Sequence, residues 1–236
     1  EYTRQWEDAV TDPKTGKKYY NIGYWPGFSK SGLTIGYGID LAYFTRDDLE
    51  DAGVNKEDID KVDKYLAKHK GYNVYPGLRG GQIASKIYPD KDILIRDAKG
   101  ARAGFKIIWD DQSTNKMQKY VEDRFTSSAK NTYEKLNKDS KKFHQLTKAQ
   151  QTVLYSITSN AGENFIEYRT KNLKKHIINN DWEAIEAELL SPRWESNLSR
   201  RNDEGMQLKN DRIKRQNEKD KAFLLPDEEV MKNAFG

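Results

Sequence analysis

Large apolar residues alternate with small or polar ones along residues 31–41, which read SGLTIGYGIDL. Alternation with a period of two predicts a β-strand with one large apolar face and one nearly bare face. Beside glycines, the bare face carries only Thr34 and Asp40. Glycine inside a strand often marks the close approach of a ligand, so the pattern indicates the floor of a cleft. A glycine-rich edge strand with a turn is the alternative.

Shorter β patterns surround this strand. Residues 18–22 predict a second strand, and turn sequences at residues 12–17 and 23–32 separate the segments. We therefore expect a small antiparallel sheet over residues 17–41. Residues 93–95 and 105–109 could form further strands. The pattern assigns no role to the surrounding segment, residues 89–112.

Most of the remaining chain has apolar residues at helical spacing, often preceded by a capping residue. Thr45, Asn55, Thr147, Thr170 and Asp181 are the predicted caps. The predicted helices cover residues 2–8, 46–52, 56–68, 82–88, 113–136, 151–161, 173–178, 182–190, 196–219 and 226–234. The pattern predicts a mainly helical α+β fold, with a small β-hairpin lobe over residues 9–44 and a larger helical lobe over residues 45–236. A cleft between two lobes is where ligands usually bind.

Composition limits the chemistry. The chain has no cysteine, which excludes disulfides and thiol catalysis. Its three histidines are scattered without metal-ligand spacing, so we expect no metal and no other cofactor. A net charge of +4 over 236 residues permits binding to an anionic polymer but does not require it. No apolar run is long enough for a membrane span, and no signal peptide is evident.

Glu7, Thr34 and Asp40 form a candidate catalytic set. Two carboxylates that flank a cleft can hydrolyse a glycosidic bond: the protonated one donates to the leaving oxygen, and the ionised one stabilises the cationic sugar or holds a water. A threonine hydroxyl can orient that water. Burial or a nearby like charge must keep the acid protonated at neutral pH. The candidate residues for this burial and for sugar stacking are Trp6, Tyr24, Trp25 and Tyr37.

Several motifs, in this order, resemble those of the phage-type lysozymes. They are RQWE at residues 4–7, YWP at 24–26, SGLTIGYGIDL at 31–41, LTKAQ at 146–150, SITSNAG at 156–162, the segment 170–190, and LSRRNDE at 198–204. The YWP and SGLTIGYGIDL runs are most similar to the branch that includes pesticin-like bacterial toxins. The resemblance covers residues 4 to about 208, apart from residues 89–112.

This resemblance implies a lysozyme-like muramidase that hydrolyses the β-1,4 bond between N-acetylmuramic acid and N-acetylglucosamine in peptidoglycan. It implies that Glu7 is the catalytic acid, Asp40 the second carboxylate and Thr34 the water-positioning hydroxyl, with inversion at the anomeric carbon. Asn160 is a candidate substrate-binding residue, although a hydrogen-bonding role at a helix end or between lobes is favoured. A structural role is likewise favoured for the two arginines of the LSRRNDE motif.

Departures from the family pattern leave alternatives open. Asp8 and Ala42 stand where the family usually has glycine. The interval between Glu7 and Thr34 is longer than usual, so Glu1 remains an alternative acid. In the phage branch the second carboxylate precedes the threonine, so Asp12 remains an alternative to Asp40.

The resemblance also sets expectations for biology. We expect residues 1–236 to form one muramidase domain, the C-terminal part of a longer protein. As an antibacterial toxin or effector it would be secreted, or delivered to the periplasm of a target bacterium, as a monomer without stable membrane insertion, and an immunity protein is an expected partner. The alternatives are a phage endolysin, a lytic transglycosylase or chitinase, and a non-catalytic cell-wall glycan-binding module. A nucleic-acid binder is disfavoured, because only the basic stretch at residues 209–221 supports it.

Overall fold

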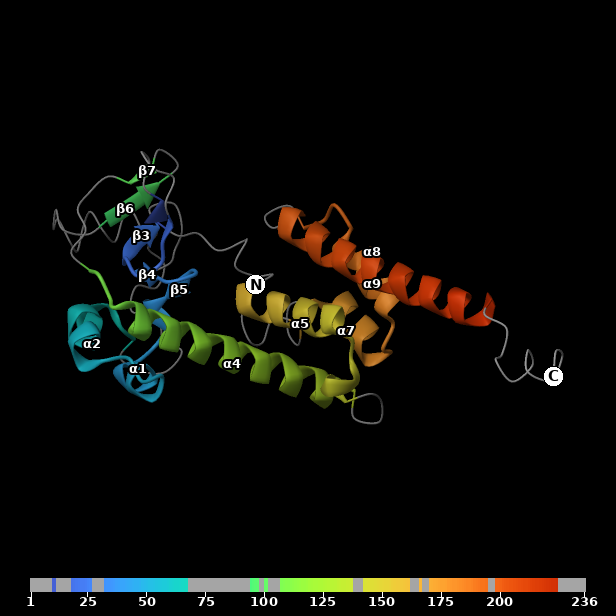
Figure 1. The fold of residues 1–236 in the computed structure, drawn as a ribbon, viewed down its shortest axis with the longest axis horizontal. Coiled ribbons are helices and arrows are strands. Elements are labelled where there is room, and N and C mark those ends of the chain that lie inside the picture. The colour runs from blue at the N-terminus through green and yellow to red at the C-terminus, as the bar shows by residue number, and fades with distance from the viewer. Residues whose placement is uncertain are drawn as a thin grey trace, which may run out of the picture. The chain divides into compact units, whose positions relative to one another are not determined.

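The computed structural model of the chain describes residues 10–11, 18–26, 32–67, 94–97, 100–101, 107–137, 142–161, 166, 170–194 and 198–224 (Figure 1). The predicted helices over residues 2–8, 82–88 and 226–234 lie outside this set. The chain divides into two compact units, Glu1–Arg124 and Phe125–Gly236. The described part is mainly helical, as predicted, and is consistent with a lysozyme-like fold.

The described residues of the first unit form two sheets. In the smaller sheet, β1 (Val10–Thr11) pairs antiparallel with β2 (Lys18–Tyr19). The larger sheet has the spatial order β5 (Ile39–Asp40), β4 (Thr34–Ile35), β3 (Tyr24–Pro26), β6 (Leu94–Asp97) and β7 (Gly100–Ala101). Only its β3–β6 pair is parallel. The strands predicted to form one antiparallel sheet over residues 17–41 therefore belong to two sheets. Strands β6 and β7 extend the larger of them.

The single strand predicted over residues 31–41 is wrong: this segment is a β-hairpin. Gly36 and Gly38 have φ angles of 65° and 83°, which glycine adopts without the steric cost that other residues meet. The turn at residues 36–38 reverses the chain, so that Thr34 pairs with Asp40. In one straight strand these residues would lie about 20 Å apart. In the hairpin they are directly opposite each other, with their side chains on the same face.

Short helices follow the hairpin and pack with the start of a long one. The elements are η2 (Leu41–Tyr43), α1 (Arg46–Asp51), α2 (Lys56–Val62), η3 (Asp63–Tyr65) and α4 (Asp111–Leu136). Thr45 and Asp48 form a capping box at the start of α1. Asp48 is 1% exposed and accepts a hydrogen bond from the Tyr120 hydroxyl at 2.9 Å. Burial, and then this bond, raises the pKa of Tyr120 to about 12.

The second unit is built from helices. It contains the end of α4 and η4 (Phe143–Gln145), α5 (Lys148–Ala161), α7 (Lys171–Ile178), α8 (Trp182–Leu189) and α9 (Leu198–Leu224). The predicted caps of α5 and α8 are confirmed: Thr147 bonds reciprocally with Gln150, and Asp181 accepts the Ala184 N–H at 3.0 Å. Thr170 precedes α7, but its side chain makes no capping bond. The buried core of this unit comprises Ala129, Tyr133, Phe143, Leu146, Val153, Leu154, Ile157, Ile166, Leu173, Ile177, Ile185, Leu189 and Leu208.

Close packing of α9 against the end of α8 explains the glycine at position 205. A Cβ there would lie 2.7 Å from Leu190 Cγ. In a helix interior, alanine is normally more stable than glycine by about 1 kcal/mol. Overpacking costs about 1–3 kcal/mol, so we expect Gly205→Ala to lower the free energy of unfolding in chemical denaturation.

Asn210→Ala, at an exposed position of the same helix, is the control for this substitution. It should leave the free energy of unfolding unchanged or raise it slightly, because alanine has the higher helix propensity. If the two alanine variants are equally stable, close packing against Leu190 is not the reason for glycine at position 205.

Candidate functional site

The hairpin fixes the Asp40 carboxylate at its open end. Asp40 Oδ1 accepts the backbone N–H groups of Gly32 and Ala42, each at 3.0 Å. Asp40 is thereby the N-cap of η2 as well as the strand partner of Thr34. A carboxylate held by two backbone donors has a defined orientation, which both a helix cap and a catalytic base require.

Gly32 is required by this carboxylate. A Cβ at position 32 would lie 2.6 Å from Ala42 Cβ and 2.9 Å from Asp40 Oδ1. Contacts this short do not occur without movement of the neighbouring atoms, so any side chain here would displace the carboxylate or the start of η2. The first glycine of the SGLTIGYGIDL run, Gly32, is therefore needed for the geometry of Asp40.

Thr34 is buried, with 3% of its surface exposed. Its Oγ1 donates to the Gly32 carbonyl at 3.2 Å, which orients the hydroxyl. A hydroxyl that donates one bond retains lone pairs that can accept a bond from a water. Residues 32, 34 and 40 therefore form one connected unit, called here the hairpin site.

The predicted aromatic residues occupy different environments. Tyr24, in β3, is 4% exposed and pairs with Thr34, so its ring belongs to the core. Trp25 is the next residue of β3 and pairs with Ile95; its side chain is outside the described set. Tyr37 lies in the hairpin turn, is partly exposed and stacks on Tyr20.

Four candidate residues lie outside the described residues. They are Glu7 and Trp6, and the alternatives Glu1 and Asp12. The pairing of Thr34 with Asp40 is therefore the part of the candidate catalytic set that the structure brings together.

Asn160 belongs to the second unit and lies near the end of α5. Its Oδ1 accepts a hydrogen bond from Arg201 Nη2 at 2.8 Å. This bond corresponds to the helix-end role favoured from the sequence. The Asn160 side chain is also exposed, so a contact with a substrate is proposed below.

The arginines at positions 200 and 201 have the structural role favoured from the sequence. Arg201 is 1% exposed and pairs with the fully buried Glu204, and Arg200 contacts the same carboxylate at 3.6 Å. Ser156 Oγ donates to Glu204 Oε1 and accepts from Arg200 Nε. Burial raises the pKa of Glu204 above its ordinary value, against the opposing attraction of the two arginines. These four residues, called here the arginine cluster, join α5 to α9.

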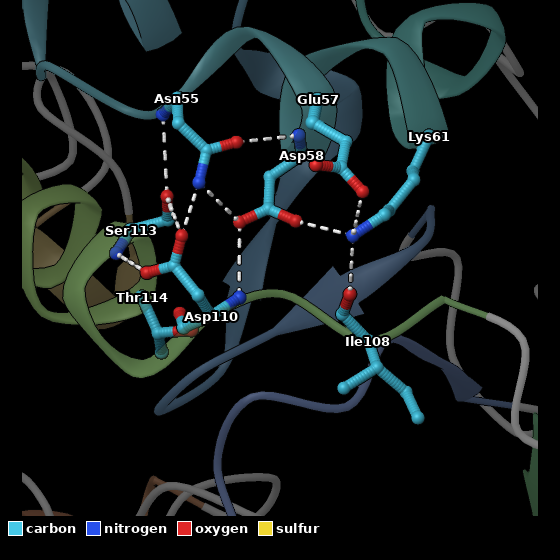
Figure 2. A network of polar contacts seen from close by, with 8 residues as sticks. All are labelled: Asn55, Glu57, Asp58, Lys61, Ile108, Asp110, Ser113 and Thr114. Atoms are coloured by element: carbon cyan, nitrogen blue, oxygen red, sulfur yellow. Dashed lines mark hydrogen bonds and ion pairs between the residues drawn. The ribbon is translucent and has the colours of Figure 1, made fainter.

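Figure 2 shows a second pair of carboxylates, Asp58 and Asp110, which the sequence patterns did not predict. Asp58, at 1% exposed, accepts the Asp110 N–H at 2.9 Å and the Lys61 ammonium at 2.6 Å. Asn55 Nδ2 donates to both carboxylates. Lys61 also donates to the Ile108 carbonyl at 2.9 Å. The network ties α2 to the start of α4.

This network caps two helices. Asn55 Oδ1 accepts the Asp58 N–H at the start of α2, and Asp110 Oδ1 accepts the Ser113 N–H at 2.6 Å. The predicted start of the long helix, at Ser113 or Thr114, is thus too late, because Asp110 caps it. The Ser113 N–H lowers the pKa of Asp110, whereas a catalytic acid needs a raised pKa. Asn55 is one of the predicted caps, and the signal that could have revealed its partner is the capping residue Asp110 directly before the pattern of the long helix.

The described residues contain no group of three or more histidine, aspartate or glutamate side chains placed to hold a metal ion. Within the same residues, none of the helices combines the length and the hydropathy needed to cross a bilayer.

The mainly helical fold is consistent with the lysozyme-like class. More specifically, residues 82–183 match the Pesticin family, described as a bacterial toxin homologue of phage lysozyme, C-terminal part. The match confirms the resemblance inferred from the motifs. It includes residues 89–112, which the motifs left out, and it contains neither the hairpin site nor residues 198–204. No curated protein matches the chain.

Proposed function

We propose that this protein is a muramidase that hydrolyses the β-1,4 bond between N-acetylmuramic acid and N-acetylglucosamine. The observation that carries the proposal is the hairpin register, which sets Thr34 directly opposite Asp40. The match of residues 82–183 to a lysozyme-like toxin family supports the same reaction class. The proposed substrate is peptidoglycan.

In the proposed reaction Glu7 is the general acid. It donates its proton to the glycosidic oxygen as the C–O bond breaks, and the leaving sugar departs as an alcohol. A water attacks the anomeric carbon from the opposite face and loses a proton to the Asp40 carboxylate. Because the water enters on the face opposite the leaving group, the configuration at the anomeric carbon is inverted. The Gly32 and Ala42 N–H groups hold Asp40 in place, and Thr34 Oγ1 accepts a bond from the attacking water.

The proposed biological role is that of an antibacterial toxin or effector. Its target is the cell wall in the periplasm of another bacterium, and a producing bacterium would need an immunity protein. This role rests on the toxin family that matches residues 82–183. Asn160 is proposed as a further contact to the glycan.

Digestion of purified peptidoglycan, with products identified by mass, tests the proposed reaction. The wild-type protein should release muropeptides with reducing ends, and Glu7→Gln should release about 100-fold less or nothing, since the amide cannot donate the proton. Products with an anhydro ring would indicate a transglycosylase.

Two other outcomes of the digestion would overturn parts of the proposal. If Glu7→Gln stays active, the acid is another residue and Glu1 is the next candidate. If the wild-type protein binds peptidoglycan and releases nothing, the chain is a glycan-binding module.

A further inference from the structure

Two tyrosine rings stack beside the turn of the β4–β5 hairpin. Tyr37 is the central residue of the turn, and its ring centroid lies 4.0 Å from that of Tyr20, with 29° between the planes. Both side chains are partly exposed. The two rings are therefore in direct contact, and an aromatic pair of this kind is stabilising beyond the burial of its area.

The stack and a backbone hydrogen bond both connect residue 20 to this turn. Tyr37 lies between two glycines with positive φ, Gly36 and Gly38. The Gly36 N–H donates to the Tyr20 carbonyl at 2.8 Å, so the backbone of residue 20 also holds the turn. The ring of Tyr37 therefore has a defined place on the loop that joins Thr34 to Asp40.

We propose that this tyrosine pair is a preformed platform for a sugar ring of the glycan strand. The proposal rests on the proposed function and deepens it. Tyr37 contacts the apolar C–H face of the sugar, and Tyr20 is a positioning residue that holds the Tyr37 ring. A ring that is ordered before binding loses less conformational entropy when the ligand arrives.

Binding of a peptide-free tetrasaccharide of alternating N-acetylglucosamine and N-acetylmuramic acid tests the platform. Calorimetry would use the catalytically silent Asp40→Asn protein as background, and KM and kcat would be measured with otherwise wild-type protein. Tyr37→Ala and Tyr20→Ala should each weaken binding and raise KM roughly 3- to 10-fold, with kcat little changed. Tyr20→Phe should keep wild-type affinity. The double alanine variant should bind no more weakly than Tyr37→Ala, because the two rings act as one unit.

Tyr155→Ala, which removes a partly exposed tyrosine on α5, is the matched control and should leave KM unchanged. Unchanged affinity in Tyr37→Ala would overturn the platform. A Tyr20→Ala protein that melts earlier but binds normally would overturn the positioning role. If the wild-type protein binds the tetrasaccharide through these tyrosines but cleaves nothing, the platform stands and the proposed hydrolysis fails. If it cleaves with a KM independent of both tyrosines, the hydrolysis stands and the platform fails.

Discussion

Asp40→Asn should lower the rate of muropeptide release at least about 100-fold without unfolding the protein. The amide oxygen of asparagine can still accept the Gly32 and Ala42 N–H groups that now bond to Asp40 Oδ1. The substitution therefore keeps the cap of η2 and removes the basic group. The rate would be measured on purified peptidoglycan, and folding by circular dichroism and the melting temperature.

Two further variants separate catalysis from capping. Asp40→Ala should lose both activity and stability, the latter by about 1 kcal/mol, because the two N–H groups lose their acceptor. Asp181→Asn changes a capping aspartate at the start of α8 in the same way and should leave activity unchanged. An Asp40→Asn protein with wild-type activity would show that Asp40 only caps the helix, and Asp12 would become the candidate second carboxylate.

Arg201→Met should lower the free energy of unfolding by about 3 kcal/mol, measured by chemical denaturation at pH 7. The substitution keeps an unbranched apolar side chain in place of the arginine stem but leaves the fully buried Glu204 without its closest cation. Arg200 still faces that carboxylate, which places the expected loss at the lower end of the range for a broken buried pair.

The loss caused by Arg201→Met should depend on pH. Burial already raises the pKa of Glu204 in the folded protein, and removal of Arg201 raises it further. The folded state then binds a proton that the unfolded state has released, so stability falls as the pH rises from the unfolded pKa through the folded one. The variant should therefore lose less stability at pH 5 than at pH 8.

Arg215→Met is the control on the same helix. Its partner Asp211 is 22% exposed and Arg215 itself is 45% exposed. An exposed pair contributes about 0–1 kcal/mol, so this variant should be nearly as stable as the wild-type protein. Equal losses in the two arginine variants, or a loss for Arg201→Met that is independent of pH, would contradict the role assigned to the arginine cluster.

Capping residues and apolar spacing were sufficient to predict most of the helices that the structure describes. Thr45, Thr147 and Asp181 accept the N–H groups predicted for them, because a cap and the helix it starts are neighbours in sequence. The resemblance to pesticin-like toxins was also readable from ordered motifs, and the family match confirms it over residues 82–183. The cap predicted at Thr170 is wrong, because its side chain makes no capping hydrogen bond.

The hairpin site needed the tertiary structure. Alternation alone is the same in a straight strand and in two short strands, and only the positive φ at Gly36 and Gly38 decides between them. The contacts of Asp58 with Asp110, and of Glu204 with Ser156, join segments 52 and 48 residues apart. The sequence determined which residues could cap, bury or react. The three-dimensional packing decided which of them meet, because hydrogen-bond partners that are distant in sequence leave no periodic signal.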